Sequence, residues 1–398
     1  MPPERPETRA TALAWVLAWL VAAGLIAFAQ YSSRDPDSQL YAGIAARLAG
    51  APLREWIAPE WWGLWGLTGP FTEHPIGLFV LPAALARLGY PAEQAAYAVN
   101  AFYQIGSLCL AAVIAAAVVP RREARALQWL LQLMPIAFVF RIRANHEYAV
   151  LAALLFAVYA TERSRARPAW IAGMLAGFCA VLLIKGPFAF IVPLVCALWL
   201  AARDDRSRRA WHAWAAIAAM PLAAAFVAWS YEAAYVDVTG RSFLDAYTGR
   251  QLPSDQVTAG FSPLRAGYNA VWYLSRILWY AFPWSILAGI VAVRAVWNGQ
   301  WTPSAEPTRQ GAWFAIAATG VLFVAFSLAH RKADRYLIPA YFIIAAVGAV
   351  EAIRRFAWLR RGVERLDRPW VPAAFFVVLC ALRIWAIGPL RQFTFWRT

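Results

Sequence analysis

Two carboxylates, Asp35 and Asp37, stand one residue apart directly after the first membrane-length apolar stretch of the chain. Acidic side chains at the mouth of a hydrophobic span are costly to desolvate, which favours a functional reason for them. Pro36 restrains the backbone between them, and a carboxylate in a partly dehydrated pocket can act as a general base. The structural alternative is capping of a helix expected over 38–49, a role that suits Asp37 better than Asp35.

Other polar residues gather in short segments between apolar runs. Glu73 and His74 precede Pro75; helix capping would explain the acid but does not require the histidine. Lys185 lies in a Lys-Gly-Pro turn with almost no polar room, so its ammonium either snorkels or faces a cavity. The remaining candidates are Arg141, Arg143, His146 and Glu147 in one turn, and His330, Arg331, Lys332, Arg335 and Tyr336 in another. Cations beside acids next to a bilayer suit a phosphorylated lipid, although arginines can also simply anchor helix ends.

A divalent metal is an alternative ligand for these segments. Glu73, His74, His146 and His330 are candidate ligands, and Glu147 could join them. Their spacing matches no known zinc pattern. The four cysteines all lie inside apolar runs without paired spacing, which indicates small buried residues and no disulfide framework. No other cofactor is indicated.

The composition is that of a polytopic membrane protein. The 398 residues are 62% hydrophobic and only 15% charged, with a mean hydropathy of +0.50. Apolar runs of about 20 residues are long enough to cross the hydrocarbon core. The 22 tryptophans suit water–lipid boundaries. Nucleic acid is therefore excluded as a partner despite the net charge of +15, and membrane lipids are expected partners.

The sequence predicts an all-α bundle of about eleven membrane spans. These are 11–30, 95–119, 126–140, 149–160, 169–184, 188–202, 210–234, 271–296, 311–329, 336–353 and 369–388. The apolar segment from Pro75 to Gly89 would cover only about 22 Å as a helix, so it is predicted to be a short juxtamembrane helix.

With that segment excluded, the arginine-rich loops all fall on the N-terminal side of the membrane, in agreement with the positive-inside rule. The candidate site residues then all fall on the opposite, outer side. Residues 31–94 form the first outer loop, which would carry the catalytic groups, and 235–270 form a second one that we interpret as a lid. The whole of 1–398 is expected to be one transmembrane domain, with no soluble domain after the last span.

Several landmarks, in this order, resemble those of the GT-C glycosyltransferases, above all the bacterial lipid A aminoarabinose transferases and the protein O-mannosyltransferases. The resemblance covers roughly 11–345. It rests on Asp35-Pro36-Asp37 with Tyr41 and Ala45-Ala46-Arg47, on Phe71-Thr72-Glu73-His74-Pro75, on Ile184-Lys185-Gly186-Pro187, and on Arg335-Tyr336-Leu337-Ile338-Pro339.

The resemblance implies transfer of a sugar from a polyprenyl-phosphate carrier to a lipid, glycan or protein acceptor. Asp35 matches the family's catalytic acid best, with Asp37 as its competitor. Glu73 matches the acid of a Glu-Lys-Pro-Pro element in which His74 here replaces the lysine, and Glu147 matches a second-loop acid that is usually Asp. The resemblance also implies a bacterial inner membrane, with the active site on the periplasmic or extracellular side.

These observations lead to one hypothesis with two alternatives. Asp35 would deprotonate an acceptor hydroxyl in an inverting transfer, while Lys185, Arg335 and their neighbours stabilise the departing phosphate. The substrate-binding set would be Tyr41, Glu73, His74, Arg141, Arg143, His146, Lys185, Arg331, Lys332, Arg335 and Tyr336. A transporter or flippase of a lipid-linked anion would instead place its polar groups near the bilayer midplane. A hydrolase that releases free sugar is the second alternative.

Overall fold

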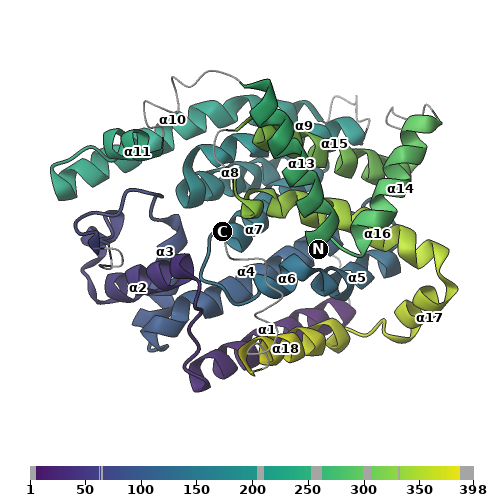
Figure 1. The fold of residues 1–398 in the computed structure, drawn as a ribbon, viewed down its shortest axis with the longest axis horizontal. Coiled ribbons are helices and arrows are strands. Elements are labelled where there is room, and N and C mark those ends of the chain that lie inside the picture. The colour runs from purple at the N-terminus through teal and green to yellow at the C-terminus, as the bar shows by residue number, and fades with distance from the viewer. Residues whose placement is uncertain are drawn as a thin grey trace.

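The computed structural model describes residues 6–61, 63, 66–203, 210–251, 262–298, 306–329 and 332–385. These ranges form a bundle of helices without β-strands (Figure 1). The α-helices are α1 (Pro6–Phe28), α2 (Pro36–Gly50), α3 (Gly77–Arg87), α4 (Ala92–Ala115), α5 (Arg121–Leu130), α6 (Pro135–Val139), α7 (Glu147–Ser164), α8 (Ile171–Lys185), α9 (Ile191–Ala202), α10 (Trp211–Thr239), α11 (Phe243–Gln251), α13 (Pro263–Tyr280), α14 (Trp284–Trp297), α15 (Pro307–Leu328), α16 (Ile338–Arg355), α17 (Ala357–Arg365) and α18 (Trp370–Trp385). Short 3₁₀ helices include η1 (Leu53–Ile57), η3 (Leu131–Leu133), η4 (Pro168–Trp170), η5 (Gly186–Phe190) and η7 (Asp334–Leu337).

The fold confirms a helical, multi-pass membrane protein. Among the described residues, six helical stretches are long and apolar enough to cross a bilayer, and the pair α17–α18, bent by 100°, could add a seventh. The six stretches are Arg9–Phe28, Ala92–Ala115, Pro168–Ala202, Trp211–Thr239, Pro307–Leu328 and Asp334–Arg355. The count of about eleven spans therefore stays a prediction.

The stretch Pro168–Ala202 reverses direction in its middle, at the turn that the sequence indicates. Its two ends both lie at the C-terminal end of α7: Arg163 stacks over the Trp170 ring at 5.8 Å, and the Trp199 indole donates to Glu162 at 2.9 Å. Gly186 provides the reversal with φ at +58°, a left-handed conformation that side chains rarely tolerate. Lys185 is thereby held at the opposite end of α7.

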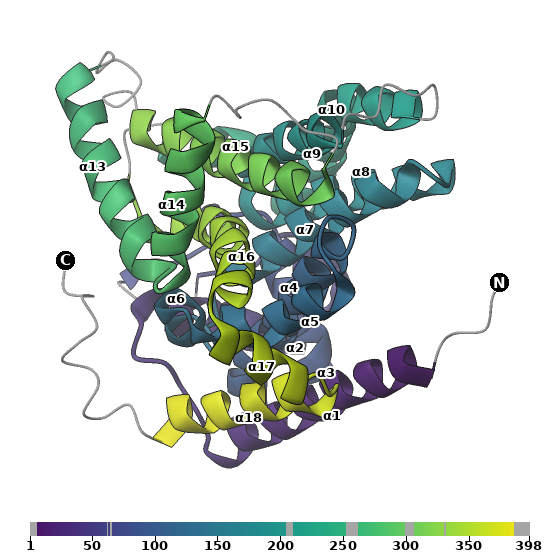
Figure 2. The same ribbon diagram turned by 90° about the vertical axis from the view of Figure 1, so that its right-hand side faces the viewer.

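Two predicted spans are wrong, and proline explains both. The segment 126–140 is divided among α5, η3 and α6, because Pro135 has no N–H to donate and its predecessor Met134 is extended. The segment 271–296 is divided into α13 and α14, with Pro283 just before α14. Figure 2 shows α13 and α14 meeting at this turn and diverging from it.

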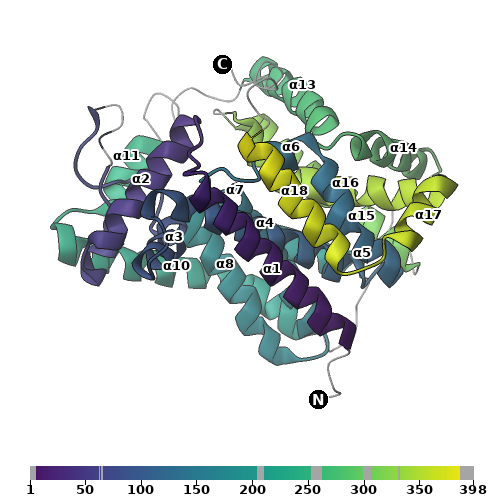
Figure 3. The same ribbon diagram turned by 90° about the horizontal axis from the view of Figure 1, so that it is seen from below.

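The short segment 75–89 is a juxtamembrane helix, as predicted. It forms α3, which packs beside α2 (Figure 3) and starts at Gly77, not at Pro75 as expected. A Cβ atom on Gly77 would lie 2.7 Å from the carbonyl oxygen of Leu183 on α8. Only glycine permits this contact between backbones, which fixes the first outer loop against the end of α8.

The second outer loop, 235–270, is partly helical in the described residues. Gly240, with φ at +67°, ends α10, and α11 follows. Phe243 of α11 packs against Tyr231 and Tyr235 with ring centroids 4.9 and 5.3 Å apart, so aromatic burial supports this helix. Residues 252–261 lie outside the described part of the chain. The role of a lid stays a prediction.

The arginine-rich segments meet at the end of the bundle opposite Lys185. Arg125 pairs with Asp367 at 2.6 Å, and Arg354 pairs with Glu123 at 2.9 Å. The 22-residue stretch Asp334–Arg355 spans roughly 33 Å at 1.5 Å per residue, about the thickness of the hydrocarbon core. This stretch separates the arginine-rich end from the end that carries Arg335.

Candidate active site

The first outer loop presents its two acids at the start of α2. Asp35 is the N-cap: its Oδ2 accepts from the backbone N–H of Ser38 at 3.1 Å and from the Ser38 hydroxyl at 2.6 Å. The expectation that Asp37 suits capping better is therefore wrong, because Pro36 is the first helical residue and places Asp35 at the cap. Arg143 lies 3.4 Å from the other Asp35 oxygen. Asp37, one residue into the helix, takes no part in the capping.

A single buried acid, Glu147, lies where four elements converge. It is the first residue of α7 and is 2% exposed. Its Oε1 lies 3.6 Å from Nε of Arg335 and 3.9 Å from Nζ of Lys185, yet neither carboxylate oxygen has a well-oriented hydrogen-bond donor. A buried carboxylate near two cations but without hydrogen bonds is poised to be rearranged by a polar ligand.

Arg335 joins the two ends of the sequence. Its guanidinium forms an ion pair with Asp37 and also approaches Glu147, so it lies between a carboxylate that is 30% exposed and one that is buried. Burying charged groups costs desolvation free energy, and the attraction between the paired charges offsets part of that cost. Asp37, Glu147, Lys185 and Arg335 thus form one partly buried cluster, which we call the acid–base pocket.

Lys185 lies in the wall of the same pocket, 8% exposed. Its ammonium lies 5.0 Å from the ring centroid of Tyr336 and 4.9 Å from that of Phe188, within cation–π range. The aromatic faces and Glu147 are the partners that stabilise this ammonium. Lys185, Arg335 and Tyr336 are therefore all brought together, as the sequence predicts.

Two histidines from different segments stack beside the acids. The rings of His74 and His146 are 4.8 Å apart, and the side of Tyr41 lies against both. Burial lowers the pKa of His146 to about 4, despite the neighbouring Glu147 carboxylate, and burial also lowers the pKa of His74. His146 is thus neutral near pH 7, so its 3.1 Å approach to Glu147 is a polar contact and not an ion pair.

The metal alternative gains no support from the described residues. No three His, Cys, Asp or Glu side chains there are grouped as metal ligands would be. Glu73 instead approaches Arg250 of α11, with 3.3 Å between Oε1 and Nε. His330, together with Arg331, lies outside the described residues.

Two predicted cations face away from the pocket. Arg141 is fully buried and donates to Gln132 at 3.0 Å, with its guanidinium over Phe376. Lys332 lies 3.8 Å from the ring centroid of Tyr268 on α13. Arg141 has its partners inside the helix packing, and Lys332 is exposed against a ring of α13. Their role in substrate binding stays a prediction.

Three polar groups that the sequence did not single out complete the pocket. The Ser38 hydroxyl lies 2.6 Å from Oδ1 of Asn145, which ties α2 to the turn before α7. Arg250 lies over the Trp61 ring at 4.7 Å and reaches Glu73. Ser38 and Asn145 directly neighbour predicted site residues in the sequence, so their position could have indicated them. Arg250 is far from Glu73 in sequence, and no local pattern connects them.

The fold and pocket define a class of protein: a helical membrane protein with one acid–base pocket at the end opposite its arginine-rich loops. Neither a protein-family model nor a curated protein matches the sequence. Solved structures do match the fold, among them two of one protein. One is the crystal structure of ArnT from Cupriavidus metallidurans bound to undecaprenyl phosphate, with a TM-score of 0.63, 16% identity and 90% of this chain covered. The other is the same protein in the apo state, with a TM-score of 0.54, 18% identity and 89% covered.

This likeness shows that the chain has the fold of the ArnT structures. It covers only 63% and 62% of the ArnT chains in the two structures, so this chain spans less than two thirds of their length.

Proposed function

We propose that this protein is a membrane glycosyltransferase that moves a monosaccharide from a polyprenyl-phosphate donor to a lipid, glycan or protein acceptor. The observation that carries the proposal is the bridge of Arg335 between Asp37 and Glu147, with Lys185 beside it. Such cations suit a lipid phosphate. The fold shared with an ArnT crystallised with undecaprenyl phosphate adds support.

Asp37 is the better general base of the two acids. It is 30% exposed and is not used for capping, whereas one oxygen of Asp35 already accepts two hydrogen bonds. Asp37 takes the proton from the acceptor hydroxyl, whose oxygen bonds to the anomeric carbon as the bond from that carbon to the phosphate oxygen breaks. Attack from the face opposite the phosphate inverts the anomeric centre.

The cations act on the leaving group. Lys185 and Arg335 stabilise the negative charge that grows on the departing polyprenyl phosphate. Glu147, buried between them, holds both in place. Arg143 orients Asp35, which in turn fixes the start of α2.

The expected location is a bacterial inner membrane, with the pocket at the outer face. The arginine-rich segments at the opposite end support this orientation, because positively charged loops remain in the cytoplasm.

The test is consumption of a donor. Purified protein is incubated with a panel of polyprenyl-phosphate sugars and candidate acceptors, and both lipids and products are followed by mass spectrometry. We expect the parent protein to consume one donor in an acceptor-dependent way, and Arg335→Met to lose this activity. The matched control is Arg54→Met, which removes a solvent-exposed pair with Asp237 and should keep the activity. Free sugar without acceptor dependence, or full activity of Arg335→Met, would contradict the proposal.

A further inference from the structure

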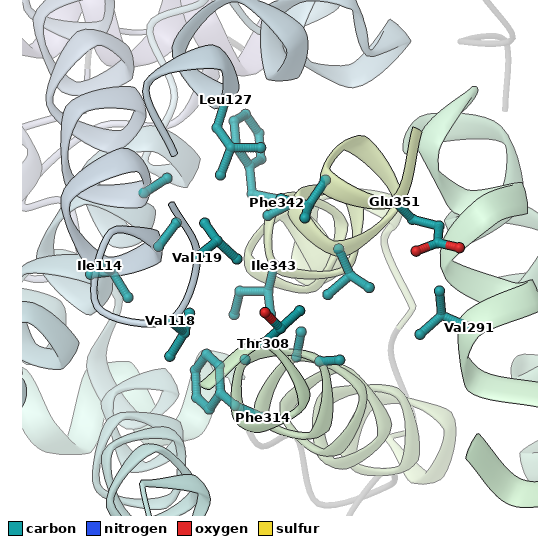
Figure 4. Close-up of a pocket in the computed structure, with 18 of the residues that line it drawn as sticks. Ile114, Val118, Val119, Leu127, Val291, Thr308, Phe314, Phe342, Ile343 and Glu351 are labelled. Carbon is teal, nitrogen blue, oxygen red and sulfur yellow. The ribbon is translucent and has the colours of Figure 1, made fainter. Parts of the chain in front are cut away.

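A second site lies at the arginine-rich end of the bundle, away from the acid–base pocket. It is a cavity of about 130 Å³ between α4, α9, α14, α15 and α16 (Figure 4). Its lining includes the apolar Val118, Phe314 and Ile343 and the polar Thr308, Glu351 and Arg354. Apolar cavities of about 150 Å³ in other proteins remain dry and bind small apolar molecules, so water is not the expected occupant.

The helices that line the cavity indicate that a ligand would enter it from the bilayer. α4, α15 and α16 are three of the helices long enough to span the bilayer, so the cavity lies at membrane depth. Small residues such as Ala312 and Ala346 line it and leave a slot between the helices. An aqueous solute has no route to such a slot, whereas a hydrocarbon chain in the bilayer does.

Charged side chains lie in and near the wall of the cavity. Arg354 there binds Glu123 and the Thr308 hydroxyl, so its charge is already paired. Arg294 lies one turn after the lining residue Val291 on α14, is exposed, and makes no ion pair with the described residues. Trp297, 87% exposed, follows three residues later, where an aromatic side chain suits the membrane boundary.

We propose that this cavity binds an acyl chain of an anionic phospholipid from the arginine-rich leaflet, with Arg294 at the phosphate. The lining is apolar apart from Thr308, Glu351 and Arg354, and both charged side chains are already paired, Glu351 with Arg355 and Arg354 with Glu123. The rest of the lining suits a hydrocarbon chain, and the exposed Arg294 one turn after Val291 complements an anionic headgroup. The site is independent of the acid–base pocket and of the proposed transferase activity.

Photo-crosslinking tests this proposal directly. Full-length protein in nanodiscs is labelled with phosphatidylglycerol that carries a diazirine in its acyl chain, and the labelled peptides are mapped by mass spectrometry. We expect label on 111–119, 312–315 and 343–350. Ala346→Phe fills the slot and should lower this label about tenfold, the effect of losing burial of about two methylene groups. Ala312→Leu is a second, milder cavity-filling variant, and Ala225→Phe on the exposed face of α10 is the matched control that should change nothing.

A second measurement tests the predicted preference for an anionic headgroup. Phosphatidylcholine with the same diazirine chain should label the cavity less than phosphatidylglycerol, and Arg294→Gln should reduce the preference about fivefold. The proposal is overturned if both cavity-filling variants fold, by gel filtration and thermal unfolding, and still label like the parent. Equal labelling by the two headgroups would overturn the anionic assignment. Labelling by a diazirine polyprenyl phosphate but not by the phospholipid would assign the cavity to the carrier lipid instead.

Discussion

Replacing Glu147 by glutamine tests the electrostatics of the pocket most directly. The side chain keeps its shape but loses its charge, and it is almost fully buried. Lys185 then loses the one acid within ion-pair distance among the described residues, whereas Arg335 keeps Asp37. The change therefore strands one buried ammonium.

The expected cost follows from the distances. At 3.6 and 3.9 Å, each cation attracts the carboxylate by about 4–5 kcal/mol at an effective dielectric constant of about 20. Desolvation of the charges offsets much of this attraction, and breaking a buried pair typically costs about 3–5 kcal/mol. Because Arg335 retains a partner, we expect a loss of about 3 kcal/mol in the free energy of unfolding.

A double-mutant cycle with Lys185→Met isolates the pair. Lys185→Met alone leaves Glu147 with Arg335, so it should cost less than Glu147→Gln, and the double variant should cost about 1–2 kcal/mol less than the sum of the two. Unfolding can be followed with a thiol-reactive dye, because the four cysteines are buried or half-buried. Unchanged stability of folded Glu147→Gln, or strict additivity of the two changes, would refute the reasoning.

Three further predictions concern the same pocket. Burial holds the pKa of His146 at about 4, below the ordinary value near 6.5, so the unfolded chain binds more protons than the folded chain between those pH values. The free energy of unfolding should therefore fall as the pH drops from about 6.5 towards 4. His146→Asn should reduce this fall in thermal-unfolding scans. Asp35→Asn preserves a capping side chain but takes a carboxylate from the buried Arg143, so it should lower stability and keep most transfer activity. Asp37→Asn should abolish transfer while remaining folded; the reverse result for activity would return Asp35 to the role of base. Arg250→Ala removes a half-exposed contact with Glu73 and should change stability by less than about 1 kcal/mol, so a larger loss in denaturant titration would reveal a structural role for α11.

Much of the arrangement was accessible from charge sidedness alone. Excluding 75–89 as a span placed the first-loop acids, Lys185 and Arg335 at one end, and the structure brings those groups into one pocket. Sequence suffices for this step because the bilayer fixes the length of a membrane span and favours positively charged loops on one side, and both features can be read from the sequence.

What the sequence could not provide was local geometry and partners distant along the chain. Apolar length alone joined 271–296 into one span, although Pro283 interrupts it. The start of α2 at Pro36, which decides whether Asp35 or Asp37 is the cap, lies within the usual uncertainty of helix boundaries. Arg141 is held inside the bundle by Gln132, a contact that depends on how the broken segment folds back.

The contact at Gly77 bears on how this chain can tolerate change. Gly77 of α3 meets the backbone of Leu183 on α8, so the two helices lie closer there than any side chain at position 77 would allow. The spacing between the first-loop acids and Lys185 therefore depends on a residue that carries no functional group. A methyl group at position 77 would push α3 and α8 apart. It would thereby disturb the acid–base pocket although residue 77 is not part of it.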